Sequence, residues 1–131
     1  MRTRATALLA SLVLVLALHV GSTPARAGDL TIETATIADL KTALASGTMT
    51  SEQLVAAYLK RIEAYDKKGP AINAVLAANP NALAEARALD AERKGGRVRG
   101  PLHGVPILVK DNYDTADLPT TAGSQLLEGH R

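Results

Sequence analysis

The chain has 131 residues, carries 15 Lys and Arg against 13 Asp and Glu, and contains no cysteine. Arg2, Arg4 and Arg26 lie in the first 27 residues, so residues 28–131 carry 12 basic against 13 acidic side chains and are close to neutral. With aromatic residues at only 2% and no basic stripe, this balance excludes a nucleic-acid-binding surface. The lack of cysteine excludes a disulfide framework, so an ordinary apolar core must hold the fold together.

The first 27 residues have the pattern of an export signal. A basic start, Met1-Arg-Thr-Arg4, precedes an apolar stretch over residues 5–20, and Ala25-Arg-Ala27 matches an A-x-A cleavage motif. The apolar stretch is shorter than the ~20 residues that a membrane-spanning helix needs. We therefore expect a cleaved signal peptide over residues 1–27, a periplasmic or secreted protein, and no stable membrane association after cleavage. An uncleaved N-terminal anchor is the alternative.

Residues 28–131 offer little bulky apolar volume. They contain no Phe, no Trp and three Tyr, and much of their apolar content is Ala. Small side chains let helices pack closely, but they bury too little surface for a self-sufficient domain of this size. The composition predicts that residues 28–131 are the N-terminal part of a single domain in a longer protein. No internal repeat or low-complexity linker divides them.

The first two predicted elements are amphipathic helices with clear start and stop signals. Thr36-Ile-Ala-Asp39 fits a capping box and begins a short helix that ends at Gly47. Thr50, with Gln53 three residues later, begins a second helix. Its apolar side chains recur at helical spacing until Gly69-Pro70 ends it.

A third helix follows after a short apolar run. Glu63 and Lys67, on the polar face of the second helix, are spaced for an i,i+4 ion pair. Residues 72–77 are apolar and compatible with a strand. Asn79-Pro80 then supplies an N-cap and a first-turn proline for the third helix, which runs to Gly95-Gly96.

The strongest indication of chemistry is Lys110. It directly follows the apolar run Val105 to Val109, which predicts a buried strand with Pro106 near its start. In α/β sheets, reacting groups gather at the carboxyl ends of strands, and a desolvated lysine can lose its proton near neutral pH. The alternative is a structural lysine that ends the strand and pairs with Asp111 or with a carboxylate further along the chain.

Four segments together resemble the start of the amidase signature family. The resemblance covers about residues 36–129 and implies an α/β fold, with N-terminal helices packed on a mixed β-sheet whose strands mostly lie beyond residue 131. The segments are Arg99-Gly-Pro-Leu-His-Gly-Val-Pro-Ile-Leu-Val-Lys-Asp-Asn112, Leu118-Pro-Thr-Thr-Ala-Gly-Ser124, Thr50-Ser-Glu-Gln-Leu-Val-Ala-Ala-Tyr-Leu-Lys-Arg-Ile-Glu63 and Ala84-Glu-Ala-Arg-Ala-Leu-Asp90.

The same resemblance implies an activity. In that family, the lysine of the Lys-Asp pair is the general base of a Ser-Ser-Lys triad that hydrolyses amide bonds, and this role falls on Lys110. A serine hydroxyl becomes a good nucleophile only when a base takes its proton, and a neutral amine can do so. No cofactor is implied, and the substrate is a small-molecule or peptide amide. The family branch that acts on misacylated transfer RNA works in the cytoplasm, so the predicted export signal argues against it.

The two serines of the triad are expected outside this sequence. Residues 28–131 contain only Ser46, Ser51 and Ser124, and none lies in a Gly/Ser-rich stretch of the kind that carries the family's relay serine downstream of the lysine. We therefore expect the domain to be truncated before that stretch and the chain to be inactive by itself. The alternative is a truncated remnant or an interaction module with no enzymatic activity.

The other polar residues near the lysine have structural interpretations. His103 lies in a turn and is expected to brace the loop, and the spacing of the histidines provides no metal site. Asp111 and Asn112 are expected to make structural hydrogen bonds, the alternative being that they orient the lysine. Thr120, Thr121 and Ser124 either line a pocket mouth or satisfy their own backbone.

Overall fold

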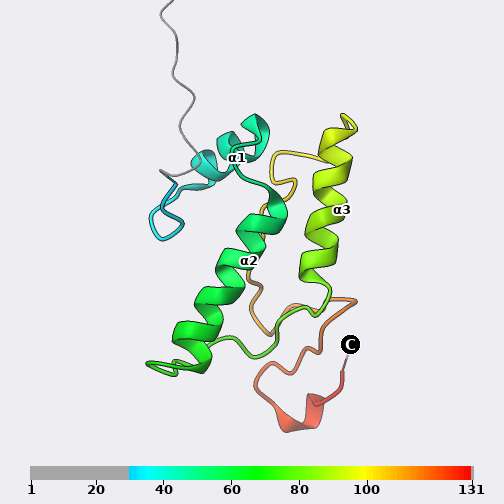
Figure 1. Cartoon of the computed structure of the whole chain (residues 1–131). Coiled ribbons are helices and arrows are strands. Elements are labelled where there is room, and N and C mark those ends of the chain that lie inside the picture. The colour runs from blue at the N-terminus through cyan, green and yellow to red at the C-terminus, as the bar shows by residue number, and fades with distance from the viewer. Residues whose placement is uncertain (1–29, 131) are drawn as a thin grey trace, which may run out of the picture.

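The computed structural model describes residues 30–130, so the predicted signal peptide lies outside the described residues. Helices α2 and α3 pack side by side, and α1 lies at the N-terminal end of α2 (Figure 1). No helix in the described part of the chain is long and apolar enough to cross a membrane. The elements, in order, are α1 (Ile37–Ser46), α2 (Ser51–Arg61), the π-helical turn η1 (Ile62–Lys67), α3 (Ala82–Lys94) and the 3-10 turn η2 (Gln125–Leu127).

The two predicted capping boxes are confirmed. In α1, the Asp39 N–H donates to the Thr36 hydroxyl at 3.2 Å, and the Thr36 N–H donates to the Asp39 carboxylate at 2.9 Å. In α2, Gln53 and Thr50 exchange the equivalent bonds at 3.1 and 2.9 Å. Each box satisfies backbone N–H groups that have no partner inside the helix, so the starts of both helices follow from residues three positions apart.

The second helix ends in a wider turn than the sequence pattern predicts. The Lys68 N–H donates to the Glu63 carbonyl at 3.0 Å, five residues back, which is the π-helical spacing. The extra residue rotates the following side chains, so Glu63 pairs with Lys68 at 2.7 Å and Lys67 pairs with Asp66 at 3.0 Å. The predicted pair between Glu63 and Lys67 is therefore wrong, because it assumed 3.6 residues per turn.

The third helix begins two residues later than predicted. The Asn79 side chain accepts the Asn81 N–H at 2.8 Å, and the Ala82 N–H donates to the Asn79 carbonyl at 3.1 Å. These bonds fold Asn79 and Pro80 into a turn that precedes the helix. Its regular hydrogen bonding starts only at Ala82.

Residues 30–130 contain no β-strand, so the mixed sheet predicted from the sequence is not observed in this part of the chain. Residues 72–77 and 105–109 are extended but pair with no neighbour. The run 105–109 is also not buried as predicted, since Ile107 is 73% exposed and Leu108 is 79% exposed. A strand is defined by its hydrogen-bonded partner, and no other described segment supplies one.

The apolar core of the described residues is small and consists of aliphatic side chains from three helices. Leu54 of α2 is fully buried, and it is the only large side chain in residues 30–130 that is. The core lies between α2 and α3, with α1 covering one end, and comprises Leu40, Ala43, Leu44, Leu54, Val55 and Ala86.

Candidate functional site

A polar junction between α2, α3 and the following loop positions the segment that ends at Lys110. The Ser51 side chain, at the start of α2, donates to the Gly104 carbonyl at 2.5 Å, and Ser51 is only 2% exposed. Arg93, near the end of α3, donates to the His103 carbonyl at 2.7 Å. Two consecutive carbonyls are thus held by two different helices immediately before the extended segment. This arrangement sets the direction in which that segment leaves the helices.

His103 braces the loop, as predicted. Its ring is buried, with the residue 7% exposed. The Arg99 N–H donates to Nδ1 at 3.2 Å, and Nε2 lies 2.9 Å from the Leu89 carbonyl oxygen. Because Nδ1 must accept and Nε2 must donate, these contacts select the neutral tautomer with its proton on Nε2. His103 therefore joins the loop to α3.

Asp90 is a structural residue that the sequence analysis missed. Its carboxylate, on α3, accepts the N–H groups of Ser51 at 2.8 Å and of Glu52 at 3.0 Å. It thus caps the first turn of α2 from a neighbouring helix, where negative charge is favourable. The partners are 38 and 39 residues apart in sequence, so no local pattern indicates the contact.

Gly104 is a turn glycine, as predicted, and the structure adds a packing reason. Its φ is +81°, a conformation that L side chains rarely adopt. A Cβ at this position would also lie 2.9 Å from the Ser51 Oγ. The junction therefore requires glycine here both for the backbone conformation and for the close approach to α2.

Lys110 ends the extended segment and is exposed. Its amine makes no hydrogen bond or ion pair with residues 30–130, so the predicted alternative of a pair with Asp111 is not observed. The Asp111 carboxylate instead accepts the N–H of Thr121 at 2.8 Å and also its hydroxyl. These bonds to Thr121, together with the charge of Lys110, hold the pKa of Asp111 below its usual value.

The loop after Lys110 is closed by its own side chains. Asp111 links the segment to Thr121 through side chain and backbone, and the Ala122 N–H donates to the Asp111 carbonyl at 2.7 Å. The buried Thr120 donates its hydroxyl to the Tyr113 carbonyl at 3.0 Å. Of the two interpretations for these hydroxyls, the structure supports satisfaction of the loop backbone. Asp111 braces the loop, as predicted.

None of the serines in the described part of the chain pairs with Lys110. The Ser46 hydroxyl donates to the Ala43 carbonyl at 3.1 Å, and the Ser124 hydroxyl accepts the Leu126 N–H at 3.3 Å. Ser51 is committed to Gly104. Residues 30–130 therefore hold no nucleophile and base in contact, and they contain no cluster of three metal-ligating side chains.

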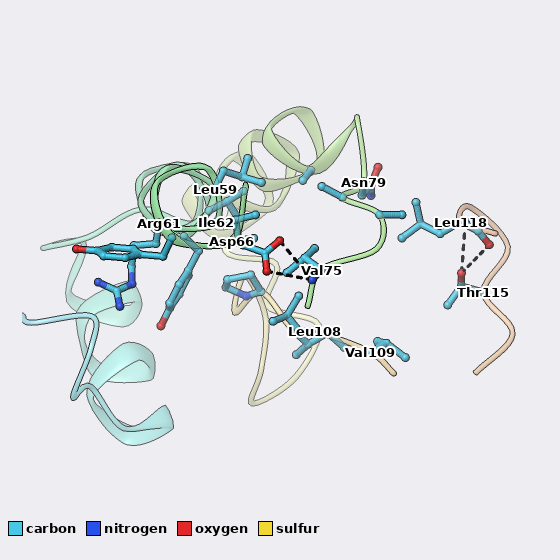
Figure 2. Close-up of a pocket in the computed structure, with 18 of the residues that line it drawn as sticks. Leu59, Arg61, Ile62, Asp66, Val75, Asn79, Leu108, Val109, Thr115 and Leu118 are labelled. Atoms are coloured by element: carbon cyan, nitrogen blue, oxygen red, sulfur yellow. Dashed lines mark hydrogen bonds between the residues drawn. The ribbon is translucent and has the colours of Figure 1, made fainter. Parts of the chain in front are cut away.

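An apolar cavity of about 610 Å³ lies between the C-terminal end of α2, η1 and the two extended segments (Figure 2). Leu59 and Ile62 contribute one wall, and Leu108 and Val109 contribute another. The buried carboxylate of Asp66 lies inside the cavity, where Figure 2 shows its bonds to Val75.

The Asp66 carboxylate is already satisfied by the protein. It accepts the Ala74 N–H at 2.6 Å and pairs with Lys67 at 3.0 Å. Burial by itself would raise the pKa of Asp66, but the bonds from Lys67 and from the Ala74 and Val75 backbone outweigh it and lower the pKa. Asp66 therefore acts as an anionic anchor that fastens the extended segment at residues 74–75 to η1.

The chain belongs to the amidase family, because the family model described as Amidase matches residues 53–131. A protein of Schizosaccharomyces pombe that bears a provisional amidase name is 45% identical over 102 residues, covering 77% of this chain and 17% of that protein. One component of the glutamyl-tRNA(Gln) amidotransferase of Streptomyces coelicolor is 45% identical over 95 residues, covering 72% of this chain and 18% of that component.

The fold is similar to that of a solved amidase structure. The peptide amidase of Stenotrophomonas maltophilia aligns with a TM-score of 0.72 and 48% identity, over 75% of this chain and 20% of that protein. The chain thus spans about a fifth of the length of the relatives that it matches. The family resemblance identified from the sequence segments is confirmed.

Proposed function

We propose that this chain is the N-terminal part of an enzyme that hydrolyses carboxylic amide bonds through a Ser-Ser-Lys triad, with Lys110 as the general base. The observation that carries the proposal is the position of Lys110. In a member of the amidase family, it ends an extended segment that is anchored on both sides, by Ser51 and Arg93 before it and by Asp111 after it. A base must be held in place to remove a proton efficiently, and these anchors restrict its backbone.

The proposal also requires a partner surface for the lysine. A lysine amine is protonated in water near neutral pH and becomes a base when burial or nearby cations destabilise its charged form. Lys110 is exposed among residues 30–130. The groups that bury it, and the two serines, must therefore come from the four-fifths of the relatives' length that this chain does not span. By this reasoning the chain alone hydrolyses no amide.

A chimera tests the proposed role of Lys110. Residues 30–130 replace the matching fifth of the Stenotrophomonas peptide amidase, and hydrolysis of a peptide amide is measured. We expect an active chimera, and a loss of at least about 1,000-fold in kcat for both Lys110→Ala and Lys110→Arg, since a guanidinium cannot act as a base. Lys41→Ala, which changes an exposed lysine on α1, serves as the matched control and is expected to keep full activity.

Two results would contradict the proposal. One is a Lys110→Ala chimera that retains more than a tenth of the activity while the Lys41→Ala chimera is unchanged. The other is amide hydrolysis by the 131-residue chain alone above its own Lys110→Ala variant, which would place a complete site within this sequence. A chain that binds other proteins but has no catalytic role would match the alternative of an interaction module.

The relatives leave two substrate branches, that of the peptide amidase and that of the glutamyl-tRNA(Gln) amidotransferase. We propose the first branch and export from the cytoplasm, because residues 1–27 have the pattern of a signal peptide. Expression of the chain in a bacterial host, followed by mass spectrometry of the periplasmic fraction, should find a mature N-terminus at Gly28. Full-length protein in the cytoplasmic fraction would favour the second branch.

A further inference from the structure

The apolar cavity beside the extended segment has the properties of a binding groove for a polypeptide strand. Its walls come from α2, η1 and the segments at residues 72–79 and 106–109. The exposed apolar side chains concentrate on these two segments: Ile72 and Leu76 on one, Ile107 and Leu108 on the other. Contiguous exposed apolar surface of this kind indicates an interaction site.

The backbone of the groove identifies the kind of ligand. Within residues 30–130, the N–H and C=O groups of Ile107, Leu108 and Val109 form no hydrogen bonds, although the chain is extended there. Both ends are fixed, by the Val105 N–H to the Leu102 carbonyl at 3.0 Å and by the bonds of Asp111 to Thr121. A fixed, extended segment with unused backbone groups is an open sheet edge, which another strand can satisfy and a helix cannot.

The polar groups of the cavity argue against a small-molecule ligand. Such pockets present a few polar side chains with free hydrogen-bonding capacity. Here the Asp66 carboxylate is used by residues 74–75 and Lys67, and the Thr115 hydroxyl donates to the Leu118 carbonyl at 3.2 Å. The unused capacity lies in the backbone of residues 107–109. The apolar side chains on both faces of that run are typical of a strand covered on both sides.

We infer that this groove receives an extended strand from the rest of an amidase domain, so that residues 106–109 become a sheet strand only when that strand pairs with them. The relatives supply the occupant, because this chain matches about a fifth of their length with a TM-score of 0.72 for the solved peptide amidase. The inference rests on the proposal that the chain is part of an amidase domain. It does not depend on the catalytic role of Lys110.

Non-covalent complementation tests the inference. The tagged 131-residue chain is co-expressed with the Stenotrophomonas peptide amidase shortened by the fifth that the chain matches, and the complex is isolated on the tag. We expect a 1:1 complex in which the amides of residues 107–109 exchange more slowly than in the free chain. Leu108→Asp is expected to weaken the complex at least about 100-fold, because it places an unpaired charge in the groove.

A matched variant separates groove binding from misfolding. Val98→Asp makes the same change at an exposed apolar residue outside the groove, and is expected to leave the complex intact. Both variants should keep the helical circular dichroism of the free chain, since both side chains are exposed.

Three results would overturn the inference. They are failure of the chain to bind the shortened enzyme while the covalent chimera is active, equal binding by Leu108→Asp and the unchanged chain, and a self-dimer of the free chain that Leu108→Asp abolishes. The last result would assign the groove to a second copy. A complex that forms but hydrolyses no amide would support the inference and refute the proposed function.

Discussion

Replacement of Gly104 by alanine is the sharpest test of how the helices position the catalytic segment. The backbone there has a φ of +81°, which costs a non-glycine residue about 1–2 kcal/mol. The added methyl group would also meet the Ser51 Oγ at 2.9 Å and the Ser51 Cβ at 3.2 Å. Overpacking of this kind costs about 1–3 kcal/mol. We therefore expect Gly104→Ala to destabilise the junction by about 3 kcal/mol in total.

Gly96 provides a control with the same backbone requirement. Its φ is +80°, but a Cβ there would have no atom within 4 Å, so Gly96→Ala should cost only the backbone term. The difference between the two variants isolates the contact with Ser51 and amounts to about 2 kcal/mol. Hydrogen exchange of the α2 and α3 amides measures it, since exchange reports the free energy of local opening. A difference of that size makes the amides exchange about 30-fold faster in Gly104→Ala than in Gly96→Ala.

Equal exchange in the two variants would refute the reasoning, because the methyl group would then fit without displacing α2. A double variant gives a second check. Ser51→Ala removes the oxygen at 2.9 Å, so it should recover part of the loss when combined with Gly104→Ala. If Ser51→Ala and Gly104→Ala are simply additive, the proposed contact does not limit stability.

Two further predictions concern charged side chains. Asp90→Ala should speed exchange of the Ser51 amide by about 10- to 100-fold, because a charge-assisted cap of a buried N–H is lost, whereas Asp114→Ala, an exposed control, should have no effect. The bonds of Arg99, burial and the bonds and charge of Arg97 together bring the pKa of Glu92 to about 2. Its contribution to stability is therefore complete above its unfolded pKa of about 4.3 and is lost as the pH falls towards 2. Helical circular dichroism should decline less steeply over that range in Glu92→Gln, and an unchanged acid profile would contradict this.

The amino-acid sequence by itself determined the starts of α1 and α2 and the family of the chain. A capping box depends on residues three positions apart, so Thr36 and Thr50 specify their helices without help from the rest of the fold. The segment from Arg99 to Asn112 is likewise a local pattern, and it was sufficient to single out Lys110 and the amidase family.

The tertiary structure decided the features that depend on distant partners. Asp90 caps α2 across 38 and 39 residues, and the junction around Gly104 joins two helices to one loop, contacts that no periodicity contains. The strand predicted at residues 105–109 did not form, because hydrophobic pattern sets a preference for extended backbone whereas a strand also needs a hydrogen-bonded neighbour. For the same reason Lys110 is exposed here: burial is a property of the surfaces that meet at a residue and not of the residue alone.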